Sequence, residues 1–194
     1  MFMESNLPVT MPALALRGLT VFPNMLLHFD VGREASIKAL DEAMTTGQPV
    51  FLVAQRDLSV ESPQLNDLYT IGTICNVRQI LRLPGDNVRV MVEGVSRGRM
   101  HSLPQTSPYL MAEVEEIRPE EPVKRSARTE ALIRQTYELF ERYIELAPKM
   151  TPDILLSVLA SEDPGYIADY IAQNLAMRTG DKQAVLEELR PVRR

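Results

Sequence analysis

Alternating apolar and polar positions dominate residues 68–100, LYTIGTICNVRQILRLPGDNVRVMVEGVSRGRM. The first run alternates from Ile71 to Leu83 with one polar exception, and the second run covers Val88 to Val92. Alternation of this kind is typical of half-buried strands. Between the runs, Pro84 presets φ and Gly85 accepts a positive φ, which predicts a type II turn. The pattern therefore predicts a long antiparallel hairpin whose apolar face is covered by other elements.

The rest of the first 118 residues supplies those elements. The continuously apolar run PVFLVAQ at 49–55 predicts a central strand that is covered on both faces. Residues 33–45 carry helical periodicity, and Gly47 ends that helix. The other predicted strands are 12–16, 26–31 and 109–117.

After residue 118 the apolar period changes from 2 to 3.6 residues. Pro119-Glu120-Glu121-Pro122 cannot continue a sheet, so it predicts a boundary there. Helices are expected at 123–147, 152–160, 163–177 and 180–189, with Thr151 and Asp163 as N-caps of the second and third. The predicted fold class is α+β: a β-rich subdomain with one helix at 1–118, followed by an all-helical bundle at 119–194.

Composition narrows the class of protein. The 194 residues are 45% hydrophobic and 24% charged, which is ordinary for a soluble globular chain. No apolar run approaches the roughly 18–20 residues of a membrane span, the start lacks the features of a secretory signal, and Cys75 has no partner cysteine. We therefore expect a cytoplasmic protein without a membrane partner. The net charge of −5 gives little support for nucleic-acid binding through phosphate contacts.

Candidate catalytic groups are few. His28, His101 and Cys75 would have to form any Cys-His or Ser-His site, and no local signature surrounds them. Ser36 and Lys38 are two residues apart, so they do not share a helix face. No His or Cys cluster has zinc spacing. We expect no catalytic residue, no metal site and no cofactor within these residues.

A binding surface is the better-supported hypothesis. Apolar residues surround a turn at 22–27, where some side chains are expected to be exposed, and polar residues of the following helix could rim that patch. The alternatives are that the apolar residues pack under the sheet and that the polar residues form an ordinary solvated face. The candidate substrate-contacting residues are Phe22, Pro23, Met25, Leu26, Arg33, Glu34 and Lys38.

Several motifs carry a family resemblance. The hairpin sequence, the opening MPALALRGLTVFPNMLLHFDVGREASIKALDEAM, the run VFLVAQRD and the segment DPGYIADYIAQNLAMRTGDKQAVLEEL occur in this order. Their order and spacing resemble the N-terminal domain of ATP-dependent Lon proteases over nearly the whole chain. Departures from the family pattern fall on Ala15, Gly18, Asn24 and the turn at 84–87, which affects loops rather than the fold.

The resemblance implies a PUA-like sheet subdomain and a non-catalytic role in protein quality control. Such a domain would recognise unfolded or damaged proteins and degron peptides, and would deliver them to ATPase and protease modules. ATP, Mg, the Ser-Lys endopeptidase activity and the hexamer of Lon subunits belong to the full-length protein, and no G-x-x-x-x-G-K-[ST] motif occurs in this chain. The alternatives are a stand-alone Lon-like binding or adaptor protein and, less expected, a nucleic-acid-binding PUA-like module.

Overall fold

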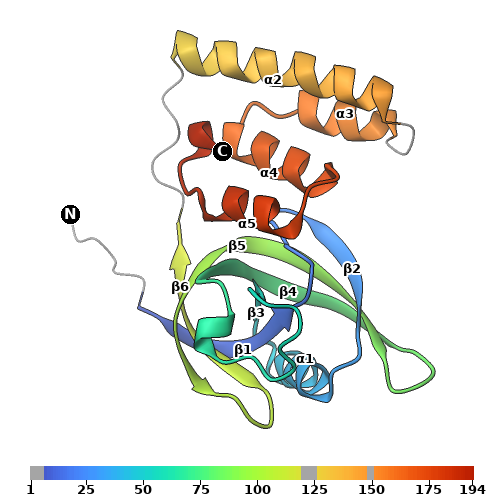
Figure 1. Ribbon diagram of the computed structural model, residues 1–194, viewed down its shortest axis with the longest axis vertical. Helices are drawn as coiled ribbons and strands as arrows, with labels where there is room; N and C mark the ends of the chain where they lie inside the picture. Colours follow the sequence, from blue (N-terminus) through green and yellow to red (C-terminus); the bar gives the residue numbers. More distant parts are fainter. Residues whose placement is uncertain (1–6, 119–125, 148–150) are drawn as a thin grey trace. The chain divides into compact units, whose positions relative to one another are not determined.

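The computed structural model describes residues 7–118, 126–147 and 151–194, and it divides into two compact units, Met1–Arg118 and Pro119–Arg194 (Figure 1). The predicted boundary segment Pro119 to Pro122 lies outside the described residues.

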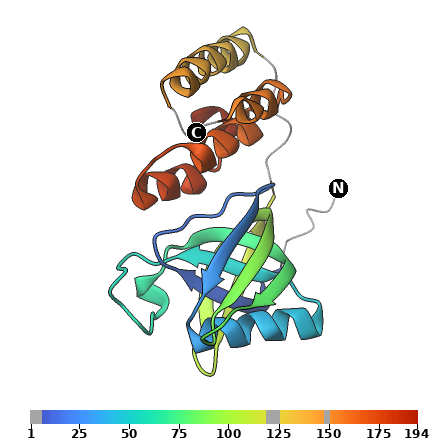
Figure 2. The same ribbon diagram turned by 90° about the vertical axis from the view of Figure 1, so that its right-hand side faces the viewer.

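The first unit is a six-stranded sheet that closes on itself (Figure 2). The strand order is β2-β5-β4-β3-β1-β6, and an additional pairing joins β6 to β5. All pairings are antiparallel except that of β1 with β3. The elements are β1 (Val9–Leu16), β2 (Leu26–Val31), α1 (Glu34–Thr46), β3 (Val50–Ala54), β4 (Ile71–Arg82), β5 (Val88–Gln105) and β6 (Leu110–Ile117).

Strand β5 makes the closure possible because it has three partners. Its first part pairs with β2, its last part pairs with β6, and β4 lies along most of its other edge. Its 18 residues include Gly94 and Gly98. At Gly94 the ladder with β4 shifts register, so that Val95 is bulged out. Bulges of this kind increase strand bending and twist, as a closed sheet requires.

Two apolar clusters lie on opposite faces of the central strands. Leu14, Leu16, Val50 and Leu52 belong to the cluster that α1 covers. Their neighbours along the strands, including Phe51, belong to the second cluster, with residues of β5 and β6. All five residues of β3 are buried, which confirms the prediction of a central strand covered on both faces.

The hairpin of β4 and β5 forms as predicted, but one of its faces differs. Gly85 has φ 82°, the positive φ predicted for it, and the next residue, Asp86, also has a positive φ of 59°. A register shift between Val77 and Gln79 inserts an extra residue in β4, and the alternation reverses beyond it. As a result, Ile80 packs on the first cluster and Leu81 is 48% exposed. The prediction that Leu81 continues the apolar face was therefore wrong.

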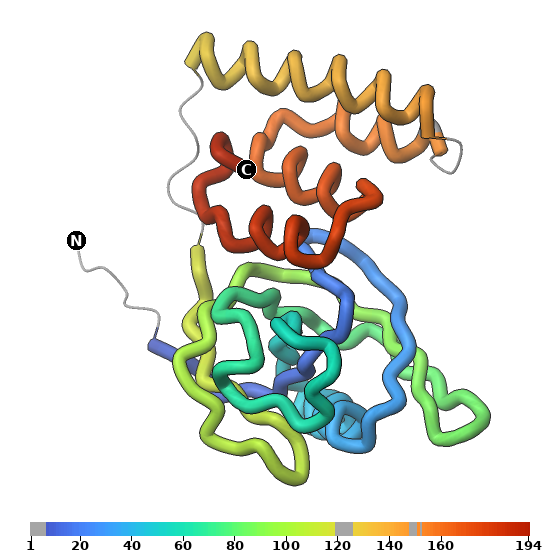
Figure 3. Tube along the Cα trace, viewed as in Figure 1, coloured from blue at the N-terminus to red at the C-terminus, as the bar shows by residue number. Residues whose placement is uncertain are grey.

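The second unit contains α2 (Ala127–Leu146), α3 (Pro152–Leu159), α4 (Pro164–Asn174) and α5 (Thr179–Glu187), and a short 3-10 turn, Pro191–Arg193, follows (Figure 3). Its core is centred on Phe140, Val158 and Ile167. The predicted cap of α4 is confirmed, because the carboxylate of Asp163 accepts a hydrogen bond of 2.8 Å from the amide of Gly165. Thr151 is the first flanking residue of α3, but its side chain makes no capping bond. The α+β class is confirmed.

The interior of the closed sheet predicts a measurable coupling between two residues. A Cβ atom added at Gly98 would lie 2.6 Å from Val114 Cγ1 and 2.9 Å from Phe51 Cε2. Gly98→Ala should therefore lower the free energy of unfolding by about 1–3 kcal/mol, as overpacked cores do. In a Phe51→Leu background the same change should cost less, because the ring edge is absent. Urea unfolding of the four proteins of this double-mutant cycle checks the coupling, and equal costs in both backgrounds would contradict it.

Candidate functional site

The predicted apolar turn packs against β5 instead of facing solvent. The amide of Asn24 donates to the carbonyl of Gly94 at 2.8 Å, and the amide of Gly94 donates to the carbonyl of Met25 at 2.9 Å. A side chain at Gly94 would lie 2.2 Å from the carbonyl oxygen of Phe22, so only glycine permits this approach. The turn is therefore held onto a strand that lies about 70 residues further along the chain.

Burial of this turn corrects the predicted patch. Phe22 is 0% exposed and Met25 is 5% exposed, and Pro23 is also buried. The expectation that these side chains form an exposed cluster was wrong, because a turn that is covered by another strand hides its apolar residues in the core. Leu26, which is 60% exposed, is the one candidate apolar residue that solvent reaches.

The three polar candidates lie at the other end of β2. Gly32 lies six residues beyond Leu26 along an extended strand, a span of roughly 20 Å. Lys38 and Glu34 form an exposed ion pair of 2.6 Å on the first turns of α1. Arg33 is half-buried, and its Nη2 donates to Oε1 of the buried Gln55 at 2.5 Å. These residues therefore do not rim the turn at 22–27, although binding by Leu26, Glu34 and Lys38 stays a prediction.

Arg33 belongs to a polar network that orders a surface loop. Gln55 Nε2 donates to the carbonyls of Asp57 and Val60, and Arg17 donates to the same Val60 carbonyl at 3.0 Å. Burial, followed by the nearby positive charge of Arg17, lowers the pKa of Arg33 from its usual range. A cavity of about 390 Å³ lies beside Arg33, between α1 and the loops at 61–64 and 106–108. Since Arg33 already donates to Gln55, and Gln55 holds the carbonyls of Asp57 and Val60, the role of this network is to support the loop that follows β3.

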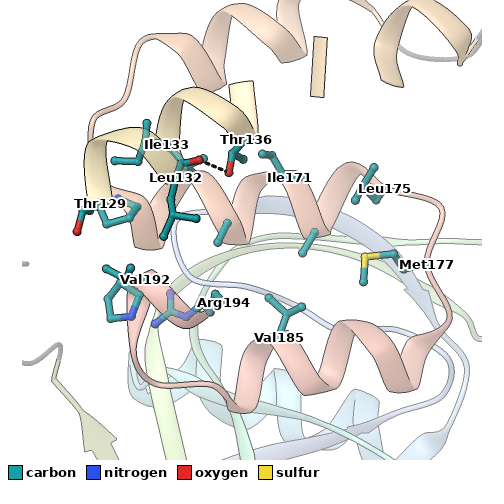
Figure 4. A pocket seen from close by; sticks show the side chains of 15 residues that line it. Thr129, Leu132, Ile133, Thr136, Ile171, Leu175, Met177, Val185, Val192 and Arg194 are labelled. Carbon is teal, nitrogen blue, oxygen red and sulfur yellow. Dashed lines mark hydrogen bonds between the residues drawn. The ribbon is translucent and has the colours of Figure 1, made fainter. Parts of the chain in front are cut away.

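The helical unit contains a more apolar pocket that the sequence did not predict (Figure 4). Its volume is about 250 Å³, and its lining includes Leu132 and Ile133 of α2, Ile171 of α4 and Val185 of α5. The full lining is Thr129, Leu132, Ile133, Thr136, Pro164, Ile167, Ala168, Ile171, Ala172, Leu175, Met177, Val185, Pro191, Val192 and Arg194.

Arg194, which lines this pocket, belongs to a buried ion pair. Arg194 Nη1 lies 3.1 Å from Asp169 Oδ2, and the two side chains are only 7% and 4% exposed. The guanidinium also donates to the carbonyls of Glu188 and Leu189, at 2.7 and 3.2 Å. Because these bonds tie the segment after α5 to α4, the charge of Arg194 is used for structure and the pocket offers mainly aliphatic surface.

The chemistry of this pocket suits apolar side chains. Small-molecule and cofactor sites usually measure about 300–1,000 Å³ and contain a few convergent polar groups. This pocket is smaller, and its polar atoms are already engaged: Thr136 Oγ1 donates to the carbonyl of Leu132 at 2.8 Å, for example. Its size and lining therefore fit one or two apolar side chains of a polypeptide.

The possible nucleophile and metal ligands found in the sequence do not form a site. Cys75 is completely buried, and burial raises the pKa of its thiol far above the usual range, so it is not a thiolate. His101 Nε2 lies 2.9 Å from a carboxylate oxygen of Glu115 on the neighbouring strand. Within residues 7–118, 126–147 and 151–194, no three His, Cys, Asp or Glu side chains are grouped closely enough to hold a metal ion.

Comparison with known proteins identifies the family. The family model described as the ATP-dependent protease La (LON) substrate-binding domain matches residues 10–194. The Lon protease of Desulforamulus reducens is 42% identical over 185 residues, which is 95% of this chain and 23% of that protein. The Lon protease of Clostridioides difficile is also 42% identical, over 92% of this chain and 23% of its own length.

The chain belongs to the Lon substrate-binding domain family. It spans about a quarter of the length of the curated Lon proteases that it matches. The fold agrees with a solved N-terminal domain of a Mycobacterium avium complex Lon protease, with a TM-score of 0.76 at 19% identity over 95% of this chain and 93% of that one. The Lon N-terminal domain protein from Xanthomonas campestris gives a TM-score of 0.67 at 13% identity. The family predicted from the sequence motifs is thereby confirmed.

Membership of the Lon family directs attention to binding surfaces rather than to catalytic groups. None of the helices in the described part of the chain combines the length and the apolar character that crossing a bilayer requires. Sequence reasoning missed the pocket of this Lon domain because its walls come from α2, α4, α5 and the residues after α5. One partial signal existed: Ile167, Ile171 and Leu175 recur every four residues along α4.

Two single substitutions distinguish the buried residue from the exposed residue in the turn of this Lon domain. Met25→Ser should lower the free energy of unfolding by about 2–5 kcal/mol, because it removes a buried side chain. Leu26→Ser should change it by no more than about 0.5 kcal/mol, because that side chain is exposed. Urea unfolding of both variants measures the difference. Similar losses for the two would show that the turn is not packed as described.

Proposed function

We propose that this chain captures unfolded or damaged proteins and degron peptides for a Lon-type ATP-dependent protease. The observation that carries the proposal is the match of residues 10–194 to a substrate-binding domain, together with an aliphatic pocket in its helical unit. Unfolded chains differ from folded ones chiefly by exposing apolar side chains, and the pocket has the size and lining to hold such a side chain.

Weak and permissive binding is adequate for this role. The lining mixes aliphatic residues with the flexible thioether of Met177, which adapts to side chains of different shape. In the proposed hexamer of Lon subunits several copies would act together, and linkage of weak sites raises the effective concentration of the client at each.

The catalytic steps belong to other parts of the proposed full-length protein. ATP and Mg would bind an ATPase module, and a Ser-Lys pair would cleave peptide bonds, in the part of the relatives that this chain does not span. We place the protein in the cytoplasm, in protein quality control. The net charge of −5 favours a protein client over nucleic acid, because phosphate binding depends on clustered Lys and Arg.

Filling the pocket tests the proposal. Ala168 lines the pocket on α4, whereas Ala184 is an exposed residue of α5 that does not line it. Ala168→Leu should lower the affinity of residues 1–194 for a permanently unfolded client about tenfold, as loss of a buried apolar side chain does. Ala184→Leu is the matched control and should leave the affinity unchanged. Binding of reduced, carboxymethylated α-lactalbumin, followed by fluorescence anisotropy, provides the measurement.

Thermal unfolding of both variants shows whether a loss of binding is caused only by a loss of stability. The expected result is a loss of binding by Ala168→Leu at an unchanged melting temperature. If Ala168→Leu is as stable as the original chain and binds the client equally well, the pocket is not the binding site. If the original chain binds no unfolded client at all, the proposed function itself is wrong.

A further inference from the structure

Strand β2 has an unusual position in the closed sheet. The order β2-β5-β4-β3-β1-β6 closes through β5 and β6, so β2 stands outside the closed ring. Among the described strands, it alone has a neighbour on only one side over its whole length, and β5 is the only element with which it makes extensive contact. Its outer edge therefore carries unpaired backbone groups over six residues.

Other open stretches of the sheet carry more features that discourage strand addition than β2 does. The outer half of β4 has a bulge and two arginines, of which Arg82 forms an ion pair with Asp41 of α1. The start of β1 contains Pro12. Natural proteins protect edge strands with bulges, prolines and charged side chains, lysine above all. The sequence of β2, LLHFDV, has no proline, lysine or arginine, and its one acidic residue, Asp30, is paired with Arg89. Its six pairs with β5 show no register shift.

The ladder itself shows which groups of β2 face outward. The amide of Gly94 donates to the carbonyl of Met25, so the bonded positions on β2 continue at every second residue from there. The N–H and C=O groups of Leu26, His28 and Asp30 therefore point away from β5. All three residues are exposed, and none of them has another backbone partner in the described part of the chain.

The side chains of β2 define what an added strand would meet. Leu27 and Phe29 are half-buried at the margin of the apolar cluster under α1, so apolar side chains on that face of an added strand would extend this cluster. On the opposite face, Asp30 is already neutralised by Arg89, whose Nε and Nη2 lie 2.6 and 2.9 Å from its carboxylate. An added strand with alternating apolar side chains would therefore pack beside β2 without leaving the charge of Asp30 unpaired.

We propose that the outer edge of β2 binds an extended segment of the client polypeptide as an added β-strand, through the backbone groups of Leu26, His28 and Asp30. This inference rests on the proposed function and names the feature that the domain recognises in its clients, which is the polypeptide backbone. The backbone is the chemical feature that all unfolded chains share. Strand addition binds it through main-chain hydrogen bonds, which depend little on sequence. Segments with alternating apolar residues, which are typical of half-buried strands, would be preferred.

Backbone-modified peptides test this directly. The probe is a labelled peptide with alternating valine and threonine that binds residues 1–194. Two further peptides carry N-methyl groups on every second residue, in the two possible frames, so that all three have the same side chains. An added strand directs alternate amides toward β2. The peptide whose N-methyl groups lie on those amides should lose about tenfold or more in affinity. The peptide methylated on the other amides should bind nearly as well as the unmodified peptide. Equal affinity of the three peptides would overturn the proposal.

A matched pair of variants places the site on β2. His28→Pro removes one outward N–H without removing a bond to β5, and proline is tolerated at such edge positions. His28→Ala removes the side chain and keeps the N–H. Peptide affinity should fall about tenfold in His28→Pro and stay within about twofold in His28→Ala, with amide hydrogen exchange of β5 unchanged in both. Loss of affinity in both variants, or in neither, would contradict the proposal.

The design separates failure of this inference from failure of the proposed function. If the unfolded client binds but the methylated frames and the His28 variants behave alike, the domain captures clients by another surface and only the strand-addition proposal is lost. If His28→Pro loses protection of β5 amides, the same frame comparison with the original chain still decides the question.

Discussion

The pairing of β5 with three partners is the constraint on which the first unit depends. A strand of 18 residues reaches β2 at one end and β6 at the other, and this closes the sheet. Closure covers one face of the central strands, α1 covers the other, and Gly94 and Gly98 admit the close approaches that closure requires. It also holds the turn at 22–25 against β5 and leaves β2 outside the ring. The stability of the unit and its most exposed backbone edge thus have a common origin.

The two proposed contact surfaces are suited to clients of varied sequence. The pocket in the helical unit offers aliphatic surface to one or two side chains, and the buried charge of Arg194 in its lining is paired with Asp169. The edge of β2 offers backbone hydrogen bonds, which every polypeptide can make. Neither surface demands a particular motif, which fits the substrate-binding domain of the Lon family.

Local sequence patterns predicted most of the fold, and long-range contacts account for the errors. The bounds of β2 and the burial of β3 follow from patterns within the segments themselves. The bulge between Val77 and Gln79 could not be foreseen, because it depends on the register with β5. Phe22 and Met25 were assigned to the surface because a turn usually lies there, whereas this turn packs against Gly94 of a distant strand and both side chains are buried. The pocket escaped prediction because four segments contribute to it.

Backbone amide chemical shifts of residues 1–194, recorded while an unfolded protein is added, test the central claim most directly. If the chain is a substrate-binding domain that acts through these surfaces, shifts should move first for Leu26, His28 and Asp30 and for residues that line the pocket, such as Ile171 and Val185. The predicted result is that the chemical shifts at these positions change and then level off as unfolded protein is added, while the other shifts change little. No change on addition of the unfolded protein, or changes confined to other surfaces, would contradict the account.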